Sequence, residues 1–162
     1  KVHISQMDTN EWIKTVSSNK KFDVVYYDPP YNKHPYSIYY FLLDIINDWN
    51  INMEVPNTYR GQPKNWEKSA YCSLKNAKTS FADLIKNTKS NFILVSYNNK
   101  GIIPIPEMEE ILNKYGKLYK IPVEHNVYNK LIGIAAKKRQ KQKKKIEEFL
   151  WLLDCRKKLV KN

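Results

Sequence analysis

The residues with the clearest chemistry are Asp28, Pro29, Pro30 and Tyr31, which directly follow an apolar run at 22–27. Successive valine and tyrosine residues favour a buried β-strand, and two consecutive prolines cannot continue one. The sequence therefore predicts a strand that ends in a stiff loop, with Asp28 at its carboxyl end. In open α/β sheets, ligands bind in the crevice beyond the carboxyl ends of the strands.

This loop has the groups needed to hold an aromatic amine. Such an amine is a poor nucleophile because its lone pair is delocalised into the ring, and two fixed acceptors on its N–H groups oppose that delocalisation. Asp28 offers a carboxylate. Pro29 offers a backbone carbonyl, which is held in place because the following Pro30 restricts the backbone of Pro29 to extended conformations. Tyr31 offers a ring on which a flipped base can stack, a contact worth about 1–3 kcal/mol. The four residues together indicate a clamp for an amino group on a planar base.

The loop is the first of several segments that occur in a recognisable order. Residues 28–32, with Tyr36 and Tyr39 after them, are followed by 68–72, 92–99 and 148–151. The ordered set resembles the adenine-specific DNA methyltransferases of bacterial restriction–modification systems, which carry an Asp-Pro-Pro-Tyr motif. These enzymes transfer a methyl group from S-adenosylmethionine to the amino nitrogen of a flipped adenine in duplex DNA. The resemblance covers most of the chain.

The resemblance implies roles for individual residues. Asp28, Pro29, Pro30 and Tyr31 would be catalytic, and Asp8, Asp28 and Tyr31 would contact S-adenosylmethionine. Asp8 lies at an expected strand-to-helix turn, where the family has an acidic residue that contacts the adenine amino group of the cofactor. A simple role as a helix N-cap fits Asp8 equally well.

Aromatic residues near the loop are candidates for contacts with the target base. We expect Tyr36 and Tyr39 to lie in a loop over the base pocket at 32–40, although packing in the core remains an alternative for both. From residue 40 onward, the apolar side chains predict an amphipathic helix that packs inward. The stretch 50–68 predicts a long loop, from which Arg60 could contact a phosphate.

A second candidate DNA contact is the basic loop at 135–145. Seven positive charges fall within residues 137–145, and they include Lys137, Lys138 and Arg139. Such a density of charge has no use in a core, so the segment is either an idle solvated loop or a phosphate-binding arm. Each phosphate neutralised would steepen the logarithmic salt dependence of binding by about 0.9. Beside a base pocket, the arm is the favoured interpretation.

The expected fold class is α/β, an incomplete Rossmann-like S-adenosylmethionine-dependent methyltransferase fold. By resemblance, its strands correspond to strands 4, 5, 6 and 7 of the family sheet, and the last strand inserts antiparallel between its neighbours as part of a terminal hairpin. Strands are expected at 1–8, 22–27, 91–97, 118–123 and 146–153, and helices after residue 8, at 77–87 and at 106–115, the last one ended by Gly116.

One part of a complete enzyme is not recognisable. The four glycines stand singly, so no glycine-containing loop for the methionine part of the cofactor is apparent. We therefore expect residues 1–162 to form a single catalytic part of a longer enzyme, with weak activity alone. Because the strand at 22–27 would be an exposed sheet edge, a missing N-terminal half or a second polypeptide should cover it. A cognate restriction endonuclease is a further expected partner in the same system.

Composition narrows the functional classes. The 162 residues carry 28 Lys and Arg against 16 Asp and Glu, which favours nucleic acid as a partner, although an ordinary basic protein remains the alternative. Two cysteines and three scattered histidines have no metal-binding spacing, so no metal is expected. No apolar run approaches the roughly 20 residues of a membrane span and no signal peptide is apparent, which suggests the cytoplasm. Alternatives to adenine methylation are an inert DNA-binding remnant, or methylation of RNA, cytosine or protein glutamine.

Overall fold

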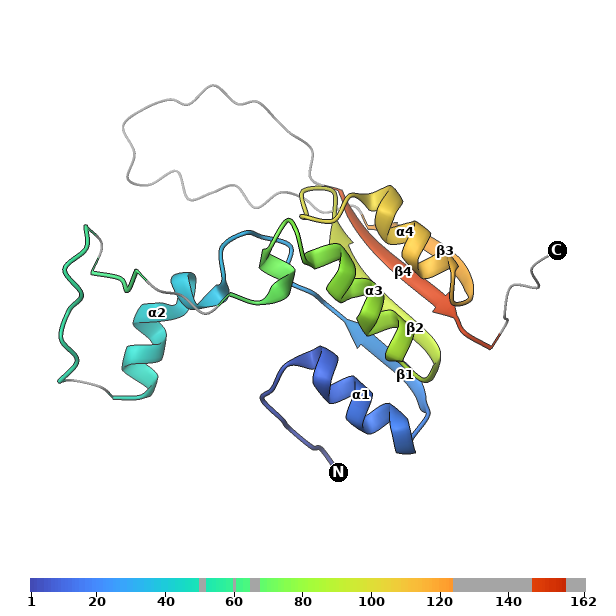
Figure 1. The fold of residues 1–162 in the computed structure, drawn as a ribbon, viewed down its shortest axis with the longest axis horizontal. Coiled ribbons are helices and arrows are strands. Elements are labelled where there is room, and N and C mark those ends of the chain that lie inside the picture. The colour runs from blue at the N-terminus through green and yellow to red at the C-terminus, as the bar shows by residue number, and fades with distance from the viewer. Residues whose placement is uncertain (50–51, 60, 65–67, 124–146, 157–162) are drawn as a thin grey trace, which may run out of the picture.

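The computed structural model describes residues 1–49, 52–59, 61–64, 68–123 and 147–156, which form a mixed α/β structure (Figure 1). The helices are α1 (Thr9–Asn19), α2 (Tyr36–Asn47), the short 3-10 helix η1 (Ala70–Cys72), α3 (Ala77–Asn87) and α4 (Ile105–Asn113). The strands are β1 (Phe22–Tyr27), β2 (Ser90–Asn98), β3 (Lys117–Val123) and β4 (Glu148–Asp154). The helices and strands expected between residues 77 and 154 are thus present, with boundaries shifted by a few residues.

The strands form one four-stranded sheet in the order β1-β2-β4-β3. β1 and β2 are parallel, with Tyr27 opposite Val95, whereas β4 is antiparallel to both β2 and β3. The last strand therefore inserts between its neighbours, and this part of the prediction is confirmed. Because β1 and β2 are parallel, their carboxyl ends lie at the same edge of the sheet.

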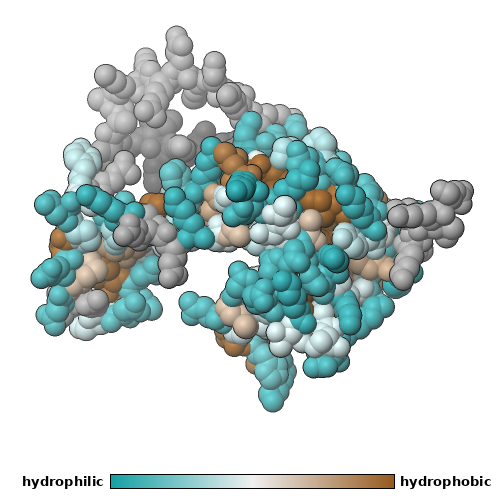
Figure 2. Space-filling view, viewed as in Figure 1, coloured by the Kyte–Doolittle hydropathy of each residue, from teal (hydrophilic) through white to brown (hydrophobic). Residues whose placement is uncertain are grey.

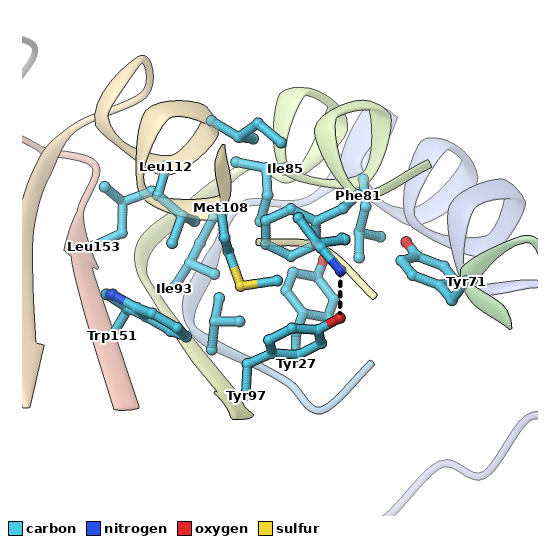
Figure 3. Packing of buried hydrophobic residues seen from close by; sticks show 14 of the residues in the cluster. Tyr27, Tyr71, Phe81, Ile85, Ile93, Tyr97, Met108, Leu112, Trp151 and Leu153 are labelled. Carbon is cyan, nitrogen blue, oxygen red and sulfur yellow. Dashed lines mark hydrogen bonds between the residues drawn. The ribbon is translucent and has the colours of Figure 1, made fainter. Parts of the chain in front are cut away.

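The core lies between the sheet and three helices, α1, α3 and α4, that cover one of its faces (Figure 1). Alternate residues of β2, Ile93, Val95 and Tyr97, point into this layer, as the two-residue period of a strand requires. Trp151 from β4 and Phe81 from α3 are fully buried in the same cluster (Figure 3). This packed layer fixes the direction in which β1 ends, and hence the position of the Asp28 loop.

The outer side of β1 is open in the described part of the chain. β1 pairs with β2 and forms the end of the described sheet. Val24 and Tyr26, on the face away from the helices, are 53% and 57% exposed. The expectation that the strand before Asp28 is an uncovered edge is confirmed for the described residues.

The strand expected at 1–8 is wrong. Residues 1–6 adopt no regular structure, and Val2 and Ile4 are almost fully exposed. A strand gains its hydrogen bonds from a neighbouring strand, and no described strand lies alongside this segment. The expected helix after residue 8 is confirmed, since Asp8 caps α1 and Ile13 is buried on its inner face.

Two expectations about residues 32–49 are also wrong. Helix α2 begins at Tyr36, within the stretch expected to be a loop up to residue 40. None of its residues is buried, although the apolar side chains after residue 40 predicted inward packing. In Figure 1, α2 projects away from the sheet and its covering helices, so its apolar side chains find no core to join.

Gly116 does not end the preceding helix as expected. α4 ends at Asn113 with Lys114 as its cap. A Cβ atom at position 116 would instead overlap the backbone carbonyl of Asp154, so glycine allows β3 to start close to the end of β4. In 50–68, the described residues contain no helix or strand, which agrees with the expected loop. The basic loop at 135–145 lies outside the described residues, and no helix among those described is both long and apolar enough to cross a membrane.

Candidate active site

A cleft of about 900 Å³ runs along β1 to its carboxyl end. Asp28, Pro29 and Pro30 form part of its wall, together with the strand residues that lead to them. Asp8 and Tyr71 line the same cleft, although they come from the start of α1 and from η1. The structure therefore brings together the two carboxylates that the sequence had marked at separate turns.

Tyr27 anchors the start of the Asp28 loop. Its hydroxyl lies 2.6 Å from the hydroxyl of Thr88 at the end of α3, and its side chain is buried. Burial raises the pKa of Tyr27 above the usual tyrosine value, so the phenol stays neutral and keeps this hydrogen bond. Asp28 therefore follows a residue that is fixed to both the sheet and the helical layer.

Tyr31 packs against the core rather than into the cleft wall. Its ring meets the ring of Tyr97 edge to face, with centroids 6.3 Å apart. The Tyr97 hydroxyl in turn accepts a hydrogen bond of 3.0 Å from the backbone N–H of Ile103 (Figure 3). The loop is thus held at both ends, by Tyr27 and by Tyr31, and the stacking role of Tyr31 stays a prediction.

The two tyrosines expected near the target base lie in different settings. Burial raises the pKa of Tyr36, and the negative charges of Tyr31 and Asp28 raise it further. Tyr36 also stacks on Tyr40, with centroids 5.9 Å apart. Tyr39 lies on α2 edge to face with His34 and is largely exposed. Neither tyrosine lines the cleft, and contact of either with a target base stays a prediction.

Asp8 is the N-cap of α1. Its carboxylate accepts a hydrogen bond of 3.1 Å from the backbone N–H of Glu11, which confirms the capping role. The same residue lines the cleft, so the two roles considered for it are compatible in position. Contact of Asp8 with a cofactor stays a prediction.

A polar cluster beside the cleft is not apparent from the sequence. The hydroxyl of the buried Tyr71 donates a hydrogen bond of 2.8 Å to Oδ1 of Asn10. Asn10 Nδ2 donates to the carbonyl of Ser80 at 2.8 Å and to the carboxylate of Asp83 at 3.0 Å. Lys14 pairs with the same carboxylate at 3.1 Å. These bonds join α1, η1 and α3, and so hold two walls of the cleft together.

We expect Asn10→Ala to lower the free energy of unfolding at pH 7 by about 1–3 kcal/mol, because the buried Tyr71 hydroxyl loses its closest acceptor. The hydrogen bond from Asn10 is also the largest cause of the lowered pKa of Asp83. Lys14 lowers this pKa further, whereas burial raises it. A lowered pKa stabilises the fold above the ordinary aspartate value of 3.8, and that stability is lost as the pH falls through the lowered pKa.

The variant should therefore lose less stability than the parent between pH 7 and about pH 3. Urea unfolding at both pH values measures this difference. Asn47→Ala is the matched control, because Asn47 is an exposed helical asparagine whose side-chain bond, to Asp48, is long at 3.4 Å. Equal stability of the Asn10 and Asn47 variants would contradict the role of the cluster.

Asn98 and Asn99 lie at the same edge of the sheet as Asp28, as the parallel pairing of β1 and β2 requires. The Asn98 side chain accepts a hydrogen bond of 2.9 Å from the backbone N–H of Lys100, so it closes its own turn. The backbone N–H of Asn99 donates a hydrogen bond to the carbonyl of Glu147, and Oδ1 of Asn99 accepts one from the backbone N–H of Glu147. Both asparagines therefore stabilise the backbone around the carboxyl end of β2.

Several predicted contacts remain outside the described residues. Arg60, Lys137, Lys138 and Arg139 belong to this group. Among the residues that the structure does describe, no group of histidine, cysteine and acidic side chains is arranged to hold a metal ion. The described site consists of carboxylates, a proline carbonyl and aromatic rings.

Sequence comparison with characterised proteins identifies relatives. The chain is 31% identical over 124 residues to the Type II methyltransferase M.NlaIII of Neisseria lactamica, a match that covers 75% of this chain and 34% of that protein. It is 27% identical over 133 residues to the Type II methyltransferase M.CviAII of Paramecium bursaria Chlorella virus 1, covering 82% and 37% of the two chains. It is 35% identical over 112 residues to the modification methylase StsI of Streptococcus sanguinis, covering 67% and 16%.

No protein-family model and no solved structure matches the chain. The chain spans little more than a third of the first two relatives and a smaller part of the third. The similarity extends over most of this chain and recurs in relatives from different hosts. Over most of its own length, the chain is therefore similar to a part of the Type II restriction–modification methyltransferases.

Proposed function

We propose that the chain is the catalytic part of a DNA methyltransferase that methylates the N6 amino group of a flipped adenine. The observation that carries this proposal is the cleft at the end of β1, which Asp28, Pro29 and Pro30 share with Asp8. The relatives are Type II methyltransferases and a modification methylase by name, which supports transfer of a methyl group to DNA. In such a system, a cognate restriction endonuclease would read the same DNA site.

The chemistry of the clamp follows from its acceptors. The Asp28 carboxylate and the Pro29 carbonyl each accept one N–H bond of the target amine, which turns the nitrogen lone pair out of conjugation with the ring. Tyr31 and Tyr36 hold the extrahelical base by contact with its face. As the new nitrogen–carbon bond forms, the nitrogen loses a proton, and the Asp28 carboxylate is the acceptor in reach. Catalysis then depends mostly on how the protein positions the amine relative to the methyl group.

The residues of the cleft fit S-adenosylmethionine at its adenosine end. The volume lies within the range of small-molecule sites, and the apolar side chains of Met7 and Tyr71 in its wall suit a planar ring. Asp8 has a carboxylate in this wall that would accept a hydrogen bond from an exocyclic amine. When bound, S-adenosylmethionine supplies an electrophilic methyl group on a cationic sulfur. The methionine end would need backbone amides from a glycine-containing loop that we do not recognise in this sequence.

The sheet supports assignment to a Rossmann-like methyltransferase fold. A parallel pair, β1 and β2, continues into an antiparallel β4 inserted before β3. In this proposal, the uncovered edge of β1 pairs with a strand from the remaining part of the enzyme, which also supplies the missing cofactor loop. The excess of basic residues, with 28 Lys and Arg against 16 Asp and Glu, supports duplex DNA as the substrate.

Methyl transfer to unmethylated genomic DNA tests the proposal. We expect labelled S-adenosylmethionine to methylate adenine little or not at all with this chain alone, and readily once the chain is joined to the polypeptide encoded in frame upstream of Lys1. Nuclease digestion and mass spectrometry of the nucleosides identify the methylated base. Methylation of cytosine would refute adenine specificity, and no transfer by the joined polypeptide would refute the proposed function.

A further inference from the structure

Helix α2 presents an apolar stripe to solvent. Tyr39, Leu42, Leu43 and Ile46 have the i, i+3, i+4, i+7 spacing that places side chains on one face of a helix. All four are between 56% and 65% exposed. In Figure 2, brown and tan side chains gather on this helix, at the left of the molecule. We call these four residues the α2 stripe.

One flank of α2 is apolar as well. Ile38 and Ile45 are half-buried, and the backbone carbonyl of Ile38 accepts a hydrogen bond of 3.0 Å from the Gln62 side chain. The loop after α2 therefore shelters one side of the helix and leaves the stripe uncovered. Exposed apolar patches of this kind mark interaction surfaces.

The α2 stripe does not suit DNA. In a chain with 28 lysines and arginines, none occurs between His34 and Tyr59. Within 35–49, the charged side chains are those of Asp44 and Asp48, both exposed. Since an α-helix has about 3.6 residues per turn, both lie on the side of α2 away from the stripe, which is itself uncharged. A surface without basic side chains offers phosphate groups no partner, and an apolar groove is its complement.

We propose that the α2 stripe docks into an apolar groove on the remaining part of the methyltransferase, the polypeptide that also covers β1. This inference rests on the proposed function. The chain spans 34% and 37% of two relatives, so most of their length lies outside the matched region and is available to form the groove. α2 begins at Tyr36, five residues after Tyr31, so docking of α2 would continue the β1 interface past the Asp28 loop.

The test measures binding between two separate polypeptides, this chain and the polypeptide encoded in frame upstream of Lys1. We expect calorimetry to show binding that Leu43→Gln weakens about tenfold, the effect of an apolar anchor in an interface. Leu74→Gln is the matched control, because Leu74 is a similarly exposed leucine outside α2, at 66% against 57% for Leu43. Both side chains are exposed in this chain, so neither change should alter its thermal unfolding.

Each other outcome overturns the inference. In the calorimetry, these outcomes are no binding, an affinity that Leu43→Gln leaves unchanged, and equal losses of affinity in both variants. Self-association of the chain that Leu43→Gln abolishes, or weaker binding of duplex DNA by Leu43→Gln, would also overturn it. Failure of the proposed function is separate, because it is measured as methyl transfer by the single joined polypeptide. If the joined polypeptide methylates DNA while the separate chains do not bind through α2, only the docking inference fails.

Discussion

Asp28→Ala is expected to lower methyl transfer by the joined polypeptide at least 10²–10³-fold, roughly the loss caused by removing one aligned polar group from an active site. The alanine removes one of the two acceptors that orient the target amine and also the acceptor for its proton. Asp28 lies in a loop that the Tyr27–Thr88 hydrogen bond and the Tyr31–Tyr97 contact hold on either side. The loop should therefore keep its course in the variant, so that the loss reflects chemistry. Labelled methyl incorporation into unmethylated DNA measures it.

The control for this variant is Asp23→Ala. Asp23 is also on β1, but its side chain is exposed and contacts Asn91, away from the carboxyl end of the strand. We expect Asp23→Ala to retain methyl transfer, and both variants to bind duplex DNA as tightly as the parent. Methylation retained in Asp28→Ala would show that the carboxylate does not carry the reaction. Loss of DNA binding in the same variant would mean that Asp28 acts in binding instead.

Trp151→Ala is expected to lower the free energy of unfolding by about 3–5 kcal/mol, the usual cost of removing a large buried ring. Trp151 is fully buried at the centre of β4, where it lies opposite Val95 of β2 and Lys120 of β3. Its indole N–H donates a hydrogen bond of 3.1 Å to Oε1 of Glu109 on α4. The variant thus leaves a cavity between the sheet and the helical layer and removes a bond that joins them. Chemical denaturation followed by circular dichroism measures the change.

Trp49→Ala is the control, because Trp49 is 74% exposed at the end of α2. We expect it to change the stability of the isolated chain by less than about 0.5 kcal/mol. The Glu109 contact adds a dependence on pH. Burial raises the pKa of Glu109, but hydrogen bonds from Lys120 and Trp151 outweigh it and lower the pKa below the ordinary value of 4.5.

The resulting stabilisation is present above pH 4.5 and is lost as the pH falls through the lowered pKa. Trp151→Ala should therefore be less sensitive to acid than the parent over that range. Equal stabilities of the two tryptophan variants would contradict the central role of Trp151.

Features set by neighbours along the chain were predictable from the sequence. The valines and tyrosines before Asp28 favour a strand, and Pro29 and Pro30 end it, because both effects act within a few residues. The cap at Asp8 and the helix at 77–87 followed from equally local patterns. The insertion of β4 between β2 and β3 came from family resemblance, since strand order depends on contacts distant in sequence.

Features that depend on a distant partner were decided by the tertiary structure. The Asn10–Tyr71 bond joins residues 61 positions apart, and no local pattern marks an asparagine as the acceptor of a buried tyrosine. Residues 1–8 have the alternation of a strand but lack a described neighbour, and α2 has the apolar pattern of a core helix but lacks a core. By itself, the sequence determined which segments can form helices, strands and the Asp28 loop. Only the tertiary structure decided which of them find partners, because burial and strand pairing require a second surface.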